Sequence, residues 1–349
     1  MLQGETGMKK ITNTKKSSNF DNKIKLVRKN NLLQEFVLVD GVGSSGKGML
    51  SHILASFKRV EKQRNDMIFD TIPRIYMLGK ISFDAASTLM ITEADQQLYH
   101  TMMSRAVNFR FKDSTGVFQN PGPFRYIHRL FMKEGDTVVE RIKNEKPIFQ
   151  NAPHDALRNS KLFFDVFGNK LKIVYILRDP IEIIYDWHKR GFGDRIGVDP
   201  REFQFSIEYK DNIVPLYAYG WEDDYIRLDP IDRNIRMVYY HFKGNMESYN
   251  KLTAERQKKV MLILFDELVS NPIPICERIA NFLGTKITHQ TKKTLKHENC
   301  PRIISQDEKK LKRKKIEQKA TKKYLKTFYD LINNYEKIVK TYSENNTNI

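Results

Sequence analysis

Short runs of apolar and β-branched residues alternate along this chain with longer segments in which apolar residues recur at helical spacing. We interpret four of the short runs as β-strands: 36–39 (FVLV), 146–150 (KPIFQ), 172–177 (KIVYIL) and 260–265 (VMLILF). Their apolar character is continuous, which is typical of strands buried on both faces. The alternation of such strands with helices predicts an α/β fold, in which helices flank a parallel sheet.

Helical periodicity is clearest in four segments. The first directly follows the first strand and carries the apolar positions Met49, Leu50, Ile53, Leu54 and Phe57. A second helix begins after the strand at 172–177, where Asp179 fits the N-cap, Pro180 the first helical position and Glu182 a capping box. The same spacing predicts helices over about 232–250 and 320–342, and we expect the last one to pack back on the domain.

Both ends and one internal stretch lack such a pattern. Residues 1–30 are rich in Lys, Asn, Thr and Ser, so we expect a flexible basic arm, followed by a single domain over 31–342 and a loose tail at 343–349. Residues 190–232 are rich in aromatics, Gly and Pro without a clear period. A long irregular stretch inside a compact domain is typical of a binding loop or lid, here for an acceptor.

The composition restricts the class of protein. The chain has 349 residues, of which 40% are hydrophobic, and a formal net charge of +18. Such a charge suits nucleic acid, an anionic membrane surface, or an anionic cofactor and substrate. No zinc-finger spacing, RNA-recognition signature or basic leucine-heptad helix is present, so we do not expect nucleic acid as the partner.

Cysteine usage and the apolar runs indicate the compartment. Two cysteines, Cys276 and Cys300, make no disulfide framework and favour a reducing environment. The N-terminus has no apolar core, and no run approaches the roughly 18 apolar residues that a spanning helix needs. We therefore expect a soluble, cytoplasmic protein without a membrane span.

The stretch VLVDGVGSSGKGMLSHIL (37–54) has most of a phosphate-binding loop. Gly41, Gly46 and Lys47 match the pattern Gly-x-x-x-x-Gly-Lys-[Ser/Thr], but Gly48 stands where nucleotide hydrolases place a magnesium-binding hydroxyl. The backbone N–H groups of 42–47 and the start of the following helix would form an anion nest, and Lys47 would reach the oxygens of the departing group.

Two alternatives remain open at this point. One is a P-loop kinase that uses ATP and Mg²⁺, because Asp266 and Glu267 after the strand at 260–265 imitate the acidic strand end of ATPases. Gly48 counts against it, since the usual metal ligand is missing. The other is a nucleotide-binding protein, or a plain glycine-rich turn, that performs no chemistry.

Three segments in order resemble the sulfotransferase family. The segment 260–284 (VMLILFDELVSNPIPICERIANFLG) resembles the family's strand, Glu-(Asp/Glu)-Leu, Pro turn and helix ending Phe-Leu-Gly. The segment 172–189 (KIVYILRDPIEIIYDWHK) is similar to its second nucleotide-binding segment, and 41–50 to its 5′-phosphosulfate loop. The resemblance implies a sulfotransferase fold, 3′-phosphoadenosine 5′-phosphosulfate (PAPS) as donor, and no metal.

The resemblance also implies donor-binding residues. The 5′-phosphosulfate group would lie against the loop residues Gly43, Ser44, Ser45, Gly46, Lys47 and Gly48. Arg178 would bind the 3′-phosphate, and a basic loop near the C-terminus, with Arg302 or Lys309, would close over it. The chain departs from the family at Asp186, where Ser is usual, and at Lys47, where many members have Thr. A carboxylate repels a phosphate, so we expect Asp186 to orient Arg178 or a lysine.

Sulfuryl transfer needs a base for the acceptor proton and cations for the leaving phosphate. His154 lies 24 residues before Arg178, a distance similar to that of the catalytic His in cytosolic members of the family, and is our expected base. Asp155 and Glu134 are alternatives, as is the interpretation of His154 as a loop or capping residue. We expect Lys47 to act in catalysis as well.

Basic residues, mostly arginines, are interleaved with aromatic residues over 105–131. This pattern fits either the binding of an anionic molecule that contains a ring, or aromatic side chains in the core with the charged side chains in solvent. The acceptor, a hydroxyl or amine on a small molecule, glycan or lipid, is not specified by the residues, and neither is the oligomeric state.

Overall fold

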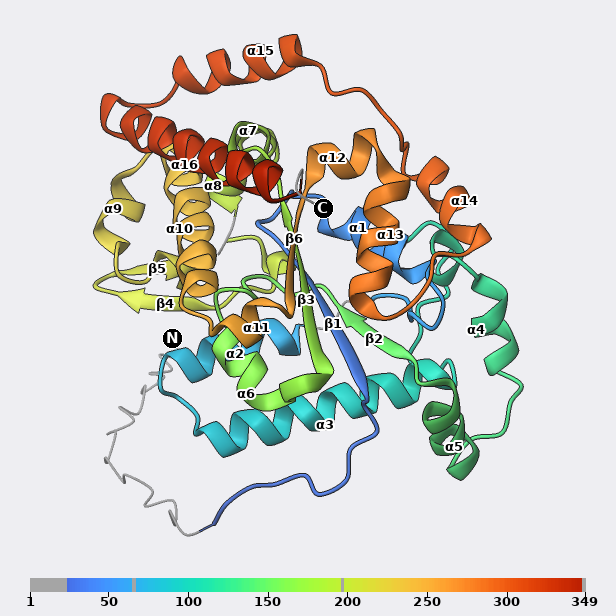
Figure 1. Cartoon of the computed structure of the whole chain (residues 1–349). Helices are drawn as coiled ribbons and strands as arrows, with labels where there is room; N and C mark the ends of the chain where they lie inside the picture. The colour runs from blue at the N-terminus through green and yellow to red at the C-terminus, as the bar shows by residue number, and fades with distance from the viewer. Residues whose placement is uncertain (1–23, 65–66, 196–197, 347–349) are drawn as a thin grey trace, which may run out of the picture.

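A parallel sheet of four strands forms the centre of the computed structural model, which describes residues 24–64, 67–195 and 198–346 (Figure 1). The strand order is β2-β1-β3-β6. The strands are β1 (Glu35–Asp40), β2 (Ile148–Asn151), β3 (Leu171–Leu177) and β6 (Val260–Leu264). All four predicted strands are thus confirmed, and so is the α/β fold with helices flanking a parallel sheet.

Each face of the sheet is covered by a helical layer. Along β1, Phe36 and Leu38 point into one core while Val37 and Val39 point into the other, which explains why the strand is continuously apolar. The larger layer contains α2 (Ile68–Met77), α3 (Phe83–Met102), α5 (Asp136–Glu145), α6 (Ser160–Phe167), α7 (Pro180–Lys189), α10 (Pro230–Asn250) and α16 (Lys322–Asn346). The smaller layer contains α1 (Lys47–Ala55), α12 (Phe265–Ser270), α13 (Pro272–Leu283) and α14 (His289–His297).

The irregular stretch at 190–232 contains several short elements. They are α8 (Phe192–Arg195), the antiparallel hairpin β4 (Ser206–Tyr209) and β5 (Asn212–Pro215), the 3₁₀ turn η4 (Leu216–Ala218) and α9 (Glu222–Arg227). Figure 1 shows the hairpin and α9 beside α10, on the side of the sheet that carries α7 and α16. This segment therefore adds a small lobe next to α10.

Three further helices complete the described part of the chain: α4 (Pro123–Arg129), α11 (Ala254–Gln257) and α15 (Gln306–Glu317). The predicted helices at 49–57, 179–189, 232–250 and 320–342 correspond to α1, α7, α10 and α16. Asp179 caps α7 as predicted, since its Oδ1 accepts from the amide of Ile181 at 2.8 Å. The capping box is wrong, because Glu182 instead pairs with Arg178 and Lys312.

The chain ends differ in part from the predicted arm and tail. Residues 24–30 run along α3, where Arg28 contacts Asp95 at 2.6 Å, and residues 343–346 continue α16. The rest of both predicted segments, 1–23 and 347–349, lies outside the described residues. Within the described ranges, no helix has the length and apolar character needed to cross a bilayer.

Candidate active site

The glycine-rich loop connects β1 to α1 at the carboxyl edge of the sheet. Gly46 adopts the left-handed conformation with φ 97°, and a Cβ there would lie 2.7 Å from the ring of Phe265. Only glycine fits both conditions. Gly48 is different, because a Cβ at that position would meet no atom within 4 Å. No side chain caps the start of α1, so no capping side chain accepts a hydrogen bond from its first backbone amides.

Side chains from α7 and from the residue that follows β3 hold this loop in place. The indole Nε1 of Trp187 donates to the carbonyl of Gly43 at 2.9 Å, and Arg178 Nη1 donates to the carbonyl of Ser44 at 2.6 Å. Within the loop, the amide of Ser45 donates to the carbonyl of Val42 at 2.9 Å. One of the amides expected in the anion nest is therefore already bonded, and the remaining loop amides are the candidates for an anion.

Lys47, the first residue of α1, points toward the loop that follows β2. Its Nζ donates to the carbonyl of Pro153 at 2.8 Å. Burial lowers the pKa of Lys47, and the carboxylates of Asp40, Asp70 and Asp155 oppose that effect. Asp40 ends β1 and is fully buried, which raises its pKa to about 7 even though Lys47 lies nearby. The lysine is thus a desolvated cation surrounded by carboxyl groups.

Two arginines, Arg178 and Arg302, lie against the ring of Phe265. The guanidinium carbon of Arg178 lies 4.5 Å from the centre of this ring, and that of Arg302 lies 5.4 Å from it. Arg178 also contacts Glu182 at 3.2 Å and Asp186 at 3.5 Å, and its Nε is buried without a partner. The structure therefore places Arg178 and Arg302 at the same ring, and Asp186 contacts Arg178.

Helix α15 lies over α7 beside these two arginines. Lys309 pairs with Asp179, Lys312 with Glu182 at 2.8 Å, and Lys315 donates to the hydroxyl of Tyr185 at 3.4 Å. The basic run at 297–325 is thus partly a set of contacts that hold α15 on α7. Lys309, which we expected as an alternative to Arg302 for closing over the 3′-phosphate, makes one of these contacts.

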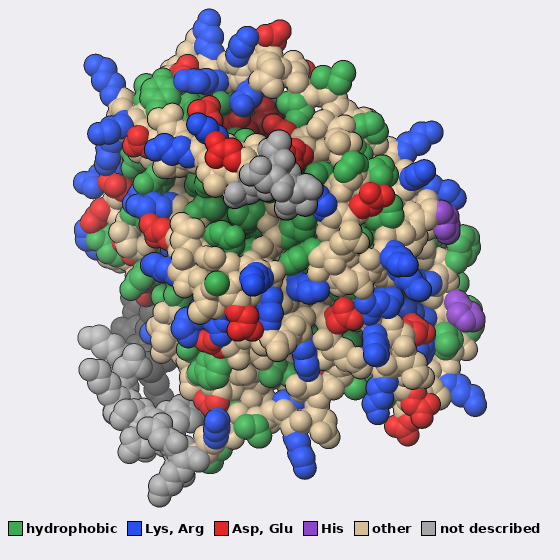
Figure 2. All heavy atoms as spheres, in the orientation of Figure 1, with side chains coloured by type: hydrophobic (Ala, Val, Ile, Leu, Met, Phe, Trp, Pro, Cys, Tyr) green, Lys and Arg blue, Asp and Glu red, His purple; other side chains and the backbone are tan. Residues whose placement is uncertain are grey.

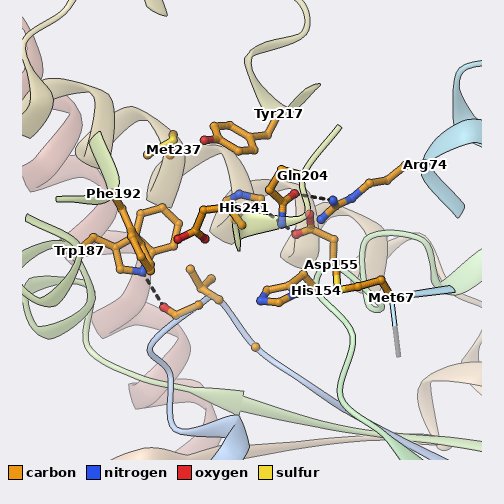
Figure 3. A pocket seen from close by; sticks show the side chains of 14 residues that line it. Met67, Arg74, His154, Asp155, Trp187, Phe192, Gln204, Tyr217, Met237 and His241 are labelled. Carbon is orange, nitrogen blue, oxygen red and sulfur yellow. Dashed lines mark hydrogen bonds and ion pairs between the residues drawn. The ribbon is translucent and has the colours of Figure 1, made fainter. Parts of the chain in front are cut away.

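A cavity of about 160 Å³ opens beside the loop, between α2, α7, α10 and the 190–232 segment (Figure 3). Its lining is mostly apolar and aromatic, with a few polar groups. The lining residues are Gly41, Val42, Gly43, Met67, Arg74, His154, Asp155, Trp187, Phe192, Glu202, Gln204, Tyr217, Met237 and His241. Figure 3 shows the aromatic residues on one side and Arg74, bonded to Gln204, on the other.

Two histidine–carboxylate pairs lie at this cavity: His154, His241 and Asp155 line it, and Asp70 is buried next to His154. His154 Nδ1 lies 3.2 Å from Asp70 Oδ1, and His241 Nδ1 lies 2.7 Å from Asp155 Oδ1. The charge of Lys47, followed by burial, lowers the pKa of His154, although its side chain is 44% exposed. Burial acts to raise the pKa of Asp155, but contact with His241 holds it below the usual range. Both histidines can therefore accept a proton through Nε2 while Nδ1 faces a carboxylate.

The structure separates the remaining candidates from this cavity. Glu134 is 66% exposed and pairs with Arg105, so it does not reach the cavity. Arg129 and Tyr126, from the interleaved segment at 105–131, are buried against Glu61. Asp266 starts α12 beside Asp179 and Lys309, and its pKa is raised by burial. Among the described residues, no group of three or more His, Cys, Asp or Glu side chains could hold a metal ion.

Sequence reasoning missed four residues of the site. Asp70 and Arg74 come from α2, His241 comes from α10, and Trp187 anchors the loop. Trp187 lies within the segment 172–189 that resembles the family's second nucleotide-binding segment, whereas no motif marks Asp70, Arg74 or His241. The only available signal was the position of Trp187 and His241 on predicted helices that follow, or face, the nucleotide-binding segments.

One comparison with known proteins shows the family of this chain. A family model described as a sulfotransferase domain matches residues 37–345. Similar solved structures include a sulfotransferase domain from the curacin biosynthetic pathway, with 11% identity, 75% of this chain and 78% of that chain covered, and a TM-score of 0.44.

Two further solved structures are similar. One is a sulfotransferase from Alicyclobacillus acidocaldarius, with 13% identity, 88% and 97% coverage, and a TM-score of 0.37. The other is a mouse sulfotransferase complexed with PAP, with 11% identity, 88% and 84% coverage, and a TM-score of 0.37. No curated protein matched the chain.

Proposed function

The chain belongs to the sulfotransferase family, and from that premise we propose that it moves the sulfuryl group of PAPS to a hydroxyl or amine of its acceptor. The observation that carries the proposal is the position of Lys47 and Arg178 on either side of the same loop. Arg178 contacts Ser44 of the loop, and Lys47 reaches Pro153 next to His154. A multiply anionic donor would thus meet fixed cations and main-chain amides.

In this proposal the glycine-rich loop binds one end of the donor, and the two arginines that flank Phe265 bind the other. The amides at the start of α1, with Lys47, bind the 5′-phosphosulfate group. Arg178 and Arg302, which flank Phe265, bind the 3′-phosphate, because a guanidinium pairs with phosphate through two parallel hydrogen bonds. Asp186 holds Arg178 in position and leaves contact with the phosphate to the arginine.

Transfer proceeds by in-line displacement in this proposal. His154 takes the proton of the acceptor, the acceptor oxygen or nitrogen bonds to sulfur, and the bond between sulfur and the bridging phosphate oxygen breaks. The products are the sulfated acceptor and adenosine 3′,5′-bisphosphate (PAP). Lys47 stabilises the negative charge that collects on the leaving phosphate. Asp70 faces Nδ1 of His154 and stabilises the imidazolium that forms.

The acceptor enters the cavity that Figure 3 shows, and the 190–232 segment acts as its lid. This segment supplies Phe192, Glu202, Gln204 and Tyr217 to the lining. A volume of about 160 Å³ is close to the roughly 150 Å³ of a protein cavity that holds one benzene ring. We therefore propose that one ring of a small molecule, or the reactive end of a glycan or lipid, occupies it. The two cysteines are unpaired and buried, which supports a reducing, cytoplasmic setting.

Calorimetry with PAP and with ATP, each with and without Mg²⁺, tests the donor. We expect PAP to bind equally well with and without the metal. Binding of ATP that requires Mg²⁺, with no binding of PAP, would overturn the proposal in favour of a kinase that uses Asp266. Transfer of labelled sulfate from PAPS to an extract of small molecules, glycans and lipids then separates an enzyme from a protein that only binds nucleotide.

A further inference from the structure

The interleaved arginines and aromatics of 105–133 form a surface away from the proposed active site. Three phenylalanines from this segment project into solvent: Phe111 is 70% exposed, Phe124 79% and Phe131 84%. Leu130 and Met132, at the end of α4, are also exposed. We call these five residues the α4 surface. The sequence offered two interpretations of this segment, a binding site for an anion with a ring and a core with solvated charges. Neither describes the α4 surface, because its apolar side chains lie neither in the core nor in the acceptor cavity.

The arrangement of the α4 surface is fixed by the fold. Phe124 lies in the first turn of α4, and Phe131 lies two residues after the end of this helix. Phe111 stacks on Phe118, with ring centres 4.2 Å apart and planes 10° apart. Tyr126, on the opposite side of α4, is fully buried and anchors the helix to Glu61. The phenylalanines are therefore presented by a rigid base.

Positive charge surrounds these apolar side chains. Arg105, Arg110, Lys112 and Lys133, from the same segment of the chain, are exposed, and Arg105 pairs with Glu134 at 2.7 Å. Beside α4 lies a hollow of about 660 Å³ whose charged lining contains Lys58, Arg59, Arg125, Arg129 and Arg141 against Glu61 and Glu145, together with His128. In Figure 2, Lys and Arg side chains crowd the side of the molecule where Figure 1 places α4 and α5.

Two arginines of the hollow each keep one hydrogen-bond donor without a partner. Glu61 contacts Arg129 at 2.8 and 2.9 Å and also Arg125 at 3.9 Å. The Nε atoms of Arg125 and Arg141 are buried without a partner. Burial, followed by the charge of Arg129, lowers the pKa of Arg141, as expected for a cation with too little negative charge nearby. An anionic group in the hollow would add negative charge beside these arginines.

We propose that the α4 surface and the hollow beside it dock the protein on an anionic lipid membrane, with the phenylalanines in the interface and a lipid phosphate in the hollow. Projecting aromatic side chains set among Lys and Arg are typical of proteins that lie on a membrane surface. The net charge of +18 adds long-range attraction to such a surface.

A membrane fits the α4 surface better than another protein does. Its apolar side chains stand apart on a turn and a short helix, and they do not form the continuous packed patch of a protein interface. The cations between them have long side chains that reach lipid phosphates at varied depth. The acceptor cavity lies between α7 and α10, so docking through α4 leaves it open.

Sedimentation with vesicles of phosphatidylcholine, with or without phosphatidylserine, tests the proposal on the full chain. We expect binding to the phosphatidylserine vesicles only, and weaker binding as salt rises. The double variant Phe124→Ser/Phe131→Ser should bind at least about tenfold more weakly, because two aromatic side chains no longer leave water. Lys112→Glu/Lys133→Glu should lose about tenfold or more through charge.

Matched controls separate this surface from the chain's general charge. Lys322→Glu/Lys326→Glu makes the same charge change on α16, and Leu89→Ser removes an exposed apolar residue on α3; both should bind vesicles like the parent. All variants alter exposed positions, and their melting temperatures should be unchanged. No preference for phosphatidylserine overturns the proposal. Full binding by the phenylalanine variant also overturns it, as does self-association through α4 without vesicle binding, which would assign the surface to a second copy.

Discussion

The ammonium of Lys47 donates a hydrogen bond to the carbonyl of Pro153 at 2.8 Å, one residue before His154. This contact ties the glycine-rich loop after β1 to the turn after β2, so the proposed phosphate-binding cation and the proposed base belong to one unit. The electrostatic result is that the charge of Lys47 lowers the pKa of His154. A base with a lowered pKa stays neutral, and therefore able to accept a proton, at more acidic pH.

Replacing Lys47 should shift the pH dependence of the reaction as well as its rate. In the parent enzyme we expect the acidic limb of kcat to lie below the ordinary histidine pKa of 6.5. Lys47→Met removes the charge while Asp70 remains, so the pKa of His154 rises and the limb moves to higher pH. Lys47→Arg keeps the charge and should keep the limb near its original position. The profile of kcat against pH measures this, and a lower kcat with an unmoved limb in Lys47→Met contradicts the coupling.

We expect the pair of His154 and Asp70 to act in catalysis and the pair of His241 and Asp155 to act in acceptor binding. His154→Ala should lower kcat by about 10²–10⁴, the usual effect of losing a general base. His241 lies across the cavity, held by Asp155, so we expect His241→Ala mainly to raise KM for the acceptor. Steady-state kinetics of both variants with one acceptor measure the split. Full turnover in His154→Ala would remove it as the base, and a larger kcat loss in His241→Ala would assign that role to His241.

The sequence was sufficient for the sheet because each strand contains a short apolar run that is set off by clear turns, although β2 also buries the polar Gln150 and Asn151. It was insufficient for α3, which has 20 residues and buries Asp95, Gln97 and Thr101 among its apolar positions. Asp95 accepts from the amides of Leu32 and Leu33, so its burial is satisfied by a segment more than 60 residues away. A buried polar side chain of this kind breaks the apolar period, and only the tertiary contact explains it.

The residues of the site also fall into those that the sequence indicates and those that only the structure reveals. Lys47, Arg178 and His154 lie in or next to local patterns of strand, turn and helix, and the structure brings Lys47 and His154 together as the parallel sheet predicts. Asp70 and His241 act only through space, because their partners are 84 and 86 residues away in the chain. Residues that orient others across such distances carry no local signal.

The contact between Arg178 and Asp186 predicts opposite effects of two substitutions on PAP binding. Arg178→Ala removes a charge-assisted pair with phosphate and should weaken binding by about 2–3 kcal/mol, or roughly 30- to 150-fold. Asp186→Ser removes a carboxylate close to the 3′-phosphate and supplies a hydroxyl, so we expect binding a few times tighter. Arg227→Ala, on the exposed face of α9, should bind PAP like the parent. Calorimetry measures all three, and weaker binding in Asp186→Ser would mean that orienting Arg178 outweighs the repulsion.

Asp40 should make the stability of the fold depend on pH. Its carboxyl is fully buried at the end of β1, and burial raises its pKa from 3.8 to about 7. Below pH 3.8 the group is protonated in both the folded and the unfolded chain, and its contribution is fully present. As pH rises toward 7 the unfolded chain releases the proton first, so the folded state loses stability, on the order of 1–4 kcal/mol.

Asp40→Asn removes this titration and keeps an oxygen for the amide of Leu157, which donates to Asp40 at 2.6 Å. We therefore expect the variant to lose less stability than the parent between pH 5 and pH 8, as measured by urea unfolding at both values. Lys47, whose pKa is lowered, contributes with the opposite sign at higher pH. Asp330→Asn, at an exposed position of α16, should follow the parent at both pH values. An equal loss of stability by Asp40→Asn at the two pH values would show that the carboxyl acts through its hydrogen bond rather than through its proton.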